Sequence, residues 1–340
     1  MVSQSRVDLR SDTVTQPTDE MRQAMATAVL GDDGYGEDPT VVELEETYAR
    51  LVGKEAAILV PSGVMANQLA LRCLTNPGEV IAAGRRQHVV AYELGAAGLN
   101  AGVQILGIDD TTGALDRDEL AEAIAGVAHH QPAITAVFAE NSHMASGGRV
   151  AAPGVIEEIA RVANGLPIHL DGARLFNASV ASGQTVGDLA SGVTTVMSCL
   201  SKGLSCPVGS LLAGPTPLIE RARVERKRLG GSMRQAGIIA ACGLVALRSM
   251  IERLADDHRR ADELRRAVSG RWPDVAPSLV GQSTNLVVFE HPDTLSLMGH
   301  LELLGIASGT IAPGMVRLVT HRGIDDSAIE RTVAAIRSAP

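Results

Sequence analysis

The chain has 340 residues, of which 45% are hydrophobic, 20% are charged and only 2% are aromatic. This balance is typical of a folded globular protein and excludes a disordered chain. The formal net charge of −9 argues against nucleic-acid binding, and the scarcity of aromatic residues argues against a stacking platform for single strands. The length indicates about two domains.

The cysteine pattern and the apolar stretches limit the environment of the protein. Four cysteines occur without a CxxC motif, so we expect no metal site, no disulfide framework and a reducing, cytoplasmic location. The N-terminal segment is polar and lacks a signal-peptide core. The longest apolar stretch, 237–247, is too short for a bilayer, which needs about 20 residues, so no membrane partner is expected.

The first two thirds of the chain alternate short apolar runs with helical patterns. Residues 56–60 predict a buried strand, and residues 64–74 predict the helix that follows it. Such alternation predicts an α/β fold with a mostly parallel sheet and helices on both faces. Further strands are expected at 79–83, 103–108, 134–139, 167–170, 194–199 and 208–213, with helices at 118–125 and 155–163.

From about residue 215 the pattern becomes long, helical and rich in charge. We expect a large domain at 1–245, which includes the N-terminal segment, and a smaller C-terminal α+β domain at 246–340. A long helix around 240–255 would join them. The expected elements are helices at 215–229 and 233–270, a strand at 285–290, a helix at 293–303, a strand at 315–320 and a helix from about 325.

Two segments place reactive side chains at predicted strand ends. Lys202 follows the strand 194–199 among Ser and Gly, where desolvation would make its amine nucleophilic; a loop lysine that reaches solvent is an equally good interpretation. Asp171 and Arg174 follow the strand 167–170, where an acid can pair with a cationic ring nitrogen and an arginine can clamp a carboxylate. Alone, this second segment slightly favours a helix cap or a mutual ion pair.

Three other segments give weaker signals. Residues 60–67 read as a strand, a small-residue turn and a helix start, which can bind an anion but alone is more typical of a helix cap. His143 follows the strand 134–139 in a Gly/Ser loop suited to acid–base chemistry, and His88 could lie over a planar ring, although most lone histidines are structural. Tyr35 lies in a loop too polar and Gly-rich for a core tyrosine.

Taken together, these side chains form a set that no single motif predicts. They are a lysine amine, an acid, arginines, an anion-binding helix start and histidines, nearly all at predicted strand ends. Pyridoxal phosphate needs a Schiff-base lysine, an acid for its ring nitrogen and a phosphate cradle. The set therefore predicts pyridoxal 5'-phosphate as the cofactor.

The chain closely resembles the low-specificity L-threonine aldolases, which are fold type I (aspartate aminotransferase-like) pyridoxal-phosphate enzymes. The similarity covers essentially the whole chain and its motifs are long and specific. They lie at 8–15, 31–39, 61–63, 140–141, 143, 147–150, 171–178, 199–203, 207–210, 229–231, 233–237 and 317–321.

The resemblance implies roles for matching residues. Lys202 would form the Schiff base, Asp171 would keep the ring nitrogen protonated, His88 would stack on the ring, and His143, His88 or a water would be the base. Arg234 would reach the phosphate from a neighbouring subunit. The implied cofactor-binding residues are Ser62, Gly63, Val64, His88, Asp171, Arg174, Lys202 and Arg234, and the implied substrate-binding residues are Ser11, Tyr35, Tyr92, Arg174 and Arg317.

The activity implied by the resemblance is retro-aldol cleavage of L-threonine, L-allo-threonine and related β-hydroxy-α-amino acids to glycine and an aldehyde. A homotetramer with active sites at a dimer interface is also implied. The alternative is another pyridoxal-phosphate lyase reaction on the same fold, such as β-elimination; a cofactor-free binding protein and a dinucleotide-dependent oxidoreductase rank below it. Val64 replaces a threonine of many relatives, which removes one hydroxyl donor to the phosphate.

Overall fold

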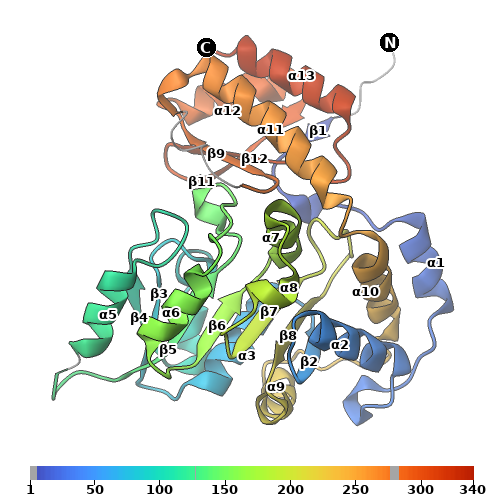
Figure 1. Cartoon of the computed structure of the whole chain (residues 1–340). Coiled ribbons are helices and arrows are strands. Elements are labelled where there is room, and N and C mark those ends of the chain that lie inside the picture. Colours follow the sequence, from blue (N-terminus) through green and yellow to red (C-terminus); the bar gives the residue numbers. More distant parts are fainter. Residues whose placement is uncertain (1–5, 127, 276–282) are drawn as a thin grey trace.

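A computed structural model describes residues 6–126, 128–275 and 283–340. Within these ranges, the larger sheet has the strand order β2-β8-β7-β6-β5-β3-β4 (Figure 1). The prediction of a mostly parallel sheet is confirmed: β3 to β7 run parallel to one another, and β8 lies antiparallel between β7 and β2. The strands are β2 (Ala56–Val60), β3 (Val80–Gly84), β4 (Gln104–Ile108), β5 (Ile134–Glu140), β6 (Ile168–Asp171), β7 (Thr195–Cys199) and β8 (Ser210–Gly214).

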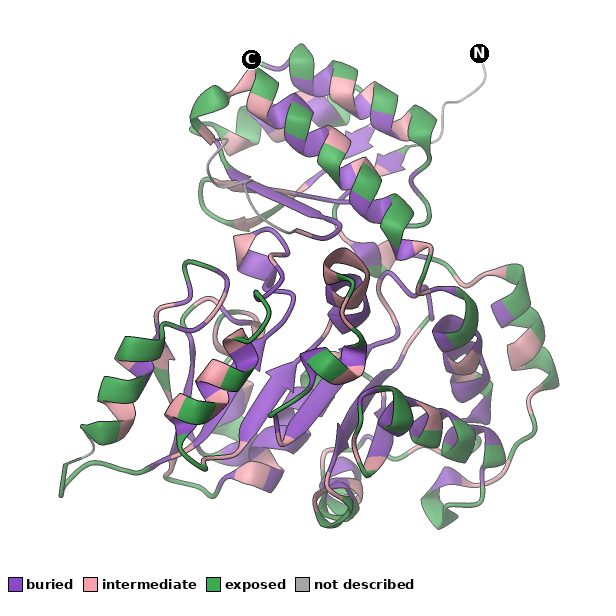
Figure 2. Ribbon diagram, viewed as in Figure 1, coloured by how far each residue is buried: buried purple, intermediate pink, exposed green. Residues whose placement is uncertain are grey.

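Helices cover both faces of this sheet, whose strands are almost entirely buried in Figure 2. Because successive strand residues point to opposite faces, Leu59 enters one core and Ile58 enters the other. The helices α3 (Gly63–Leu74) and α9 (Thr216–Arg228) contribute to the core around Ile58. The core around Leu59 receives α2 (Pro39–Leu51), α5 (Arg117–Ala125), α6 (Val155–Ala163), α7 (Leu175–Ser182), α8 (Val186–Leu189) and α10 (Gly237–Ser249).

The C-terminal part has its own sheet and core. Its strands β9 (Leu286–Glu290), β12 (Met315–Val319) and β11 (Gly309–Ala312) are antiparallel in the order β11-β12-β9. The helix expected around 240–255 is wrong, because α10 ends at Ser249 and packs on the large core, whereas α11 begins at Leu254 and packs on the C-terminal core. The other C-terminal helices are α11 (Leu254–Arg271), α12 (Thr294–Leu303) and α13 (Asp326–Arg337).

The N-terminal segment forms an arm that touches both parts of the molecule. Its strand β1 (Val7–Asp8) pairs in parallel with β10 (Ile306–Ala307), so Val7 is buried in the C-terminal core. Further along the arm, the Thr15 hydroxyl donates to the backbone oxygen of Lys202 at 2.9 Å. The arm therefore lies between the C-terminal core and the loop after β7. The domain boundary at residue 245 stays a prediction, but the first strand packs with the C-terminal core.

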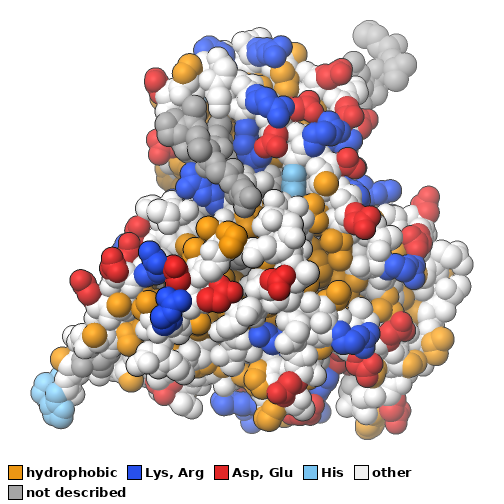
Figure 3. Space-filling model, in the orientation of Figure 1, with side chains coloured by type: hydrophobic (Ala, Val, Ile, Leu, Met, Phe, Trp, Pro, Cys, Tyr) orange, Lys and Arg blue, Asp and Glu red, His pale blue; other side chains and the backbone are white. Residues whose placement is uncertain are grey.

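The surface carries charges of both signs. On the face drawn in Figure 3, acidic and basic side chains are interspersed rather than gathered by sign. The described helices, which also include α1 (Asp19–Thr27) and α4 (His88–Ala91), contain no segment with the length and hydropathy of a membrane span.

Candidate active site

A cavity of about 230 Å³ lies where β6, β7 and the start of α3 converge. Ligand sites in open α/β sheets form outside the carboxyl ends of the strands, and this cavity has that position. The structure therefore brings together six side chains or backbone groups that the sequence predicted from four separate segments. These residues are Ser62, Gly63, Val64, His88, Asp171 and Lys202.

Asp171 is the last residue of β6 and its carboxylate is buried. It accepts hydrogen bonds from the Asn67 side-chain amide at 2.8 Å and from the backbone N–H of Ala173 at 3.0 Å. Burial alone would raise the pKa of Asp171, but the positive charges of His88 and Lys202 outweigh burial and the pKa is lowered. Asp171 is therefore a buried carboxylate that stays ionised and can pair with a cation in the cavity.

Lys202 lies in a tight loop between β7 and β8. Its backbone oxygen accepts from the N–H of Ser205 at 2.8 Å, and Ser205 has a φ of 67°, so the chain turns back on itself directly after the lysine. A Cβ on Gly203 would lie 2.9 Å from Leu254, which explains the glycine beside the lysine. The loop thus holds the Lys202 side chain in the cavity wall.

The start of α3 offers free backbone donors. Ser62 is the N-cap, and its hydroxyl accepts from the Met65 N–H at 3.2 Å. The Ala66 N–H bonds to the Ser62 oxygen, which leaves the N–H groups of Gly63 and Val64 without intrahelical partners. A Cβ on Gly63 would lie 2.8 Å from the Cys199 sulfur, so only glycine fits. A helix start of this kind binds a phosphate well.

His88 contributes an imidazole whose orientation is fixed by a carboxylate. Its Nδ1 lies 3.0 Å from Glu93 Oε1, and its backbone N–H donates to Glu140 at 2.8 Å. Burial would lower the pKa of His88, but the hydrogen bond to Glu93 and the charge of Asp171 outweigh it, and the pKa is raised. Because Glu93 binds Nδ1, Nε2 is the ring nitrogen that remains for a ligand. The analysis of the sequence missed Glu93, which lies five residues after His88.

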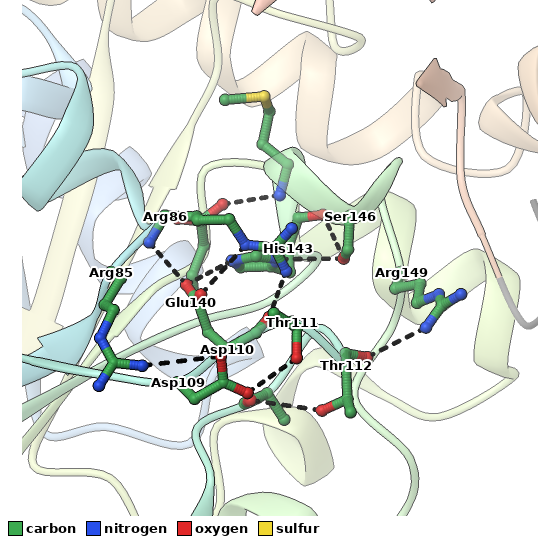
Figure 4. Close-up of polar contacts among 12 residues, drawn as sticks. Arg85, Arg86, Asp109, Asp110, Thr111, Thr112, Glu140, His143, Ser146 and Arg149 are labelled. Atoms are coloured by element: carbon green, nitrogen blue, oxygen red, sulfur yellow. Dashed lines mark hydrogen bonds and ion pairs between the residues drawn. The ribbon is translucent and has the colours of Figure 1, made fainter. Parts of the chain in front are cut away.

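His143 occupies a different place. Its imidazole is 1% exposed and is not among the residues that line the cavity. Nδ1 lies 2.9 Å from the Ser146 hydroxyl and Nε2 lies 3.1 Å from Asp110 Oδ2, so both ring nitrogens have protein partners (Figure 4). Arg86 holds Asp110 through its backbone N–H and its guanidinium. Of the two histidines expected near the substrate, the structure brings only His88 into the wall of this cavity.

Arg174 makes a buried ion pair that the sequence did not predict. Its Nε and Nη2 donate to the two carboxylate oxygens of Asp12 at 2.8 and 2.7 Å. Neither side chain is more than 6% exposed. These bonds use two of the five guanidinium N–H groups, one on Nε and one on Nη2, so the expectation that Arg174 also binds a substrate carboxylate through Nη1 and Nη2 stays a prediction. Asp12 was missed because 162 residues separate it from its partner.

Arg317 lies on β12, and its guanidinium group is only partly hydrogen-bonded by the described residues. Its Nη2 donates to the backbone oxygen of Arg10 at 2.9 Å, whereas its buried Nε has no hydrogen-bond partner among the described residues. Burial and the nearby charge of Arg174 lower the pKa of Arg317. An unpartnered guanidinium N–H in this position suits a ligand carboxylate.

The other residues expected around a substrate lie at varying distances from the cavity. Ser11 caps a short 3-10 turn and accepts from the Thr13 N–H at 3.2 Å. Tyr92 is half-buried, with its ring 5.7 Å from that of His88. Tyr35 and Arg234 line a separate hollow of about 650 Å³, and Tyr35 is 79% exposed. One chain alone therefore does not bring Tyr35 and Arg234 to the Lys202 cavity.

Comparison with known proteins identifies the family. The sequence profile of the beta-eliminating lyases matches residues 8–289. The chain belongs to the beta-eliminating lyase family. Within this family it is 37% identical over 345 residues to low-specificity L-threonine aldolase 1 of Arabidopsis thaliana, with 98% of this chain and 96% of the relative covered. It is 36% identical over 338 residues to the low specificity L-threonine aldolase of Escherichia coli K12, with 98% of each chain covered.

Solved structures show that this family member has the fold of pyridoxal-phosphate enzymes. The Leishmania major threonine aldolase matches with a TM-score of 0.84 at 19% identity, covering 97% of this chain and 98% of that chain. Serine palmitoyltransferase of Sphingomonas wittichii matches with a TM-score of 0.78 at 16% identity, covering 98% and 86%. At such low identities the likeness concerns the fold, and the predicted fold type I architecture is confirmed.

Proposed function

We propose that this chain cleaves L-threonine, L-allo-threonine and related β-hydroxy-α-amino acids to glycine and an aldehyde, with pyridoxal phosphate as its cofactor. The observation that carries the proposal is the convergence of Lys202, Asp171 and the α3 start on one cavity. The full-length similarity to low-specificity L-threonine aldolases supports the substrate class.

The residues present fit the cofactor. The free N–H groups of Gly63 and Val64 would bind its phosphate, the buried carboxylate of Asp171 would pair with its ring nitrogen, and Lys202 would hold its aldehyde carbon covalently. A Cβ at position 63 would lie 2.8 Å from the Cys199 sulfur, so glycine lets this helix start pack closely against β7. When bound, the cofactor supplies an electron sink for the bond that breaks beside the amino carbon.

The protein side chains supply positioning and proton transfer. The ionised Asp171 holds a proton at the ring nitrogen, which keeps the sink positively charged. The Arg317 Nε–H binds the substrate carboxylate and fixes which bond stands across the ring. In its neutral form, with the ring proton on Nδ1 beside Glu93, His88 accepts the proton of the β-hydroxyl at Nε2, a general-base role that typically contributes about 10²–10⁴-fold.

A second copy of the chain would complete the site. Tyr35 and Arg234 lie outside the cavity in one chain, and Tyr35 is 79% exposed. An exposed aromatic side chain that is expected at a substrate suits an interface, so we propose that each copy lends Tyr35 and Arg234 to its neighbour in a homotetramer. We also propose a cytoplasmic location, which the four unpaired, buried cysteines support.

The test is product analysis with purified protein and added pyridoxal phosphate. We expect glycine and acetaldehyde in equal amounts from L-threonine or L-allo-threonine, and no turnover by Lys202→Ala, which lacks the amine that anchors the cofactor. Borohydride reduction should fix the cofactor to Lys202. Pyruvate and ammonia from L-serine without glycine from either threonine epimer would overturn the proposal and indicate β-elimination.

A further inference from the structure

A chain of hydrogen bonds runs from the middle of the sheet to the cavity. His169 and Asp171 are two residues apart on β6, so their side chains lie on one face. His169 Nδ1 lies 2.9 Å from Thr195 Oγ1 on β7, and its Nε2 lies 3.0 Å from Asn67 Oδ1 on α3. Asn67 Nδ2 then donates to Asp171 at 2.8 Å and to Glu93 at 2.7 Å. All five side chains are buried.

These partners fix the state of the His169 ring. The Asn67 side-chain oxygen can only accept a hydrogen bond, so His169 Nε2 carries the ring proton and the Thr195 hydroxyl donates to Nδ1. Burial lowers the pKa of His169 to about 4, so the ring is neutral near pH 7. Phe138 lies against the ring, with centroids 4.8 Å apart. His169 is therefore a fixed donor aimed at Asn67.

The two carboxylates decide which way the Asn67 amide faces, and His169 holds it there. If the amide were turned over, its oxygen would face both carboxylates, so the oxygen faces the His169 ring and accepts from Nε2–H. In the observed orientation, one NH₂ group gives one N–H to Asp171 and the other to Glu93. Glu93 also binds Nδ1 of His88. Asn67 thus lies between two carboxylates: that of Asp171, which would contact the ring nitrogen, and that of Glu93, which orients the His88 imidazole.

We propose that Asn67, oriented by His169, is a positioning residue that holds the carboxylates of Asp171 and Glu93 where they bind the cofactor ring nitrogen and His88. The proposal rests on the proposed function and adds to it two residues that the motif roles leave out. The amide matters because one carboxylate oxygen each of Asp171 and Glu93 and a ring nitrogen of His88 all lie within 4.8 Å of one another. Two carboxylates this close do not both stay ionised without donors between them.

The charges around Asp171 give the sign of the effect. Burial would raise its pKa, and the surrounding positive charges together with the Asn67 hydrogen bond lower it instead. Without the Asn67 donor the pKa of Asp171 rises, so the carboxylate is neutralised, and stops attracting a ring cation, at a higher pH. The titratable groups that face Asp171 are His88 on α4, Glu93 beyond it, Glu140 at the end of β5, His169 on β6 and Lys202 after β7.

The test measures binding of pyridoxal phosphate to the full-length, cofactor-free protein, from the visible absorbance that develops on titration at a series of pH values. Asn67→Leu removes the amide, and His169→Phe removes its orienting donor. His169→Gln is the rescue variant, because a glutamine amide can place a donor near the position of Nε2. Thr195→Val is the matched control: it removes a buried hydrogen bond to the same ring but leaves the donor to Asn67.

We expect Asn67→Leu and His169→Phe to weaken cofactor binding about tenfold or more, the cost of a lost charge-assisted hydrogen bond. The acid midpoint of binding should also move to higher pH, whereas His169→Gln and Thr195→Val should keep the wild-type midpoint. Wild-type affinity and midpoint in Asn67→Leu would overturn the proposal, as would an equal shift in Thr195→Val, which would mean that the network only supports the fold.

Two features keep the test decisive. If Asn67→Leu does not give a cooperative thermal transition, the pair His169→Phe and His169→Gln decides, since rescue by glutamine is not expected of a packing defect. Threonine cleavage is assayed separately. A wild-type protein that binds the cofactor but forms no glycine from threonine would sink the proposed function and leave the role of Asn67 standing.

Discussion

Single side chains in this protein gain their importance from partners that are far away in the sequence. Asp12 is fully buried beside Arg174 and also accepts from Asn285 at 3.1 Å. Burial would raise the pKa of Asp12, but the charge and hydrogen bonds of Arg174 outweigh it and lower the pKa far below its ordinary value. The pair therefore stabilises the fold above the unfolded-state pKa of about 3.9, and this stabilisation is lost as the pH falls toward the folded-state pKa.

We expect Asp12→Asn to lower the free energy of unfolding at pH 7 by about 3–5 kcal/mol, because it leaves a buried guanidinium unpaired. Urea unfolding at pH 7 measures the loss. The control is Arg6→Ala, which breaks an ion pair whose two side chains are both 56% exposed and should cost less than about 1 kcal/mol. Equal free energies of unfolding for Asp12→Asn and the wild type would contradict a stabilising role of this ion pair.

A second residue-scale prediction concerns Glu93 and His88. Since the pKa of His88 is raised by its partner, Glu93→Gln should lower the pKa of the His88 ring in the cofactor-free protein. The raised pKa contributes stability that is full below the unfolded-state value of about 6.5 and is lost as the pH rises through the folded-state value. NMR titration of the ring measures the midpoint, with Glu302→Gln as a remote control. An unmoved midpoint in Glu93→Gln would contradict the pairing.

At the same scale, the sequence predicted one half of the site. Lys202, Asp171 and the α3 start could be recognised because each follows an apolar strand within a few residues, so local pattern placed them at one sheet edge. Asn67 and His169 could not be given roles, because the bond between them joins residues 102 apart. The signal that was available is periodicity. His169 lies two residues before Asp171 on a strand, and Asn67 lies one turn after Gly63 on a helix, so each shares a face with a predicted site residue.

Elements position the site through their ends. The start of α3 carries the N–H groups of Gly63 and Val64 that have no intrahelical partner, and the Ser62 hydroxyl caps it. The strands β2 to β8 were predicted well because apolar runs mark buried strands. β1 and β10 have two residues each and no such run, so they were missed. The prediction of one helix across 240–255 was wrong. The apolar pattern continues between α10 and α11, although α10 packs on the large core and α11 packs mainly on the C-terminal core.

We expect Ser62→Ala to lower stability by about 1 kcal/mol through the lost cap and also to weaken binding of pyridoxal phosphate. Thr18→Ala removes an equivalent cap, on α1, and should cost similar stability without changing cofactor affinity. Val64→Thr restores a hydroxyl at the cavity and should tighten binding. Thermal unfolding and cofactor titration measure the two effects. Equal affinities of Ser62→Ala and Thr18→Ala would exclude the Ser62 hydroxyl from binding of the phosphate.

At the scale of the whole molecule, the roles expected of Tyr35 and Arg234 require a second copy of the chain. Both line a hollow that is separate from the Lys202 cavity, so within one chain neither residue reaches that cavity. The resemblance to the aldolases implied shared sites, and the 79% exposure of Tyr35 agrees with a surface that a second copy would cover.

Mixing two inactive variants tests this arrangement. We expect Lys202→Ala and Arg234→Ala each to have little turnover, and we expect activity to return when they are unfolded, mixed and refolded together. A mixed dimer then has one site with both residues intact, because lysine and arginine come from different copies. Co-refolding Lys202→Ala with Asp171→Ala, whose altered residues share one cavity, is the control and should stay inactive. No recovery in the first mixture would contradict shared sites.

The N-terminal arm joins the Lys202 loop to strand β10. Val7 pairs with Ile306, and Thr15 bonds to the backbone of Lys202, so the arm docks only after nearly all of the described chain exists. A ribosome-bound chain that has already produced the lysine loop still lacks the strand that holds the arm in place. The contact between the arm and this loop is therefore completed late in synthesis.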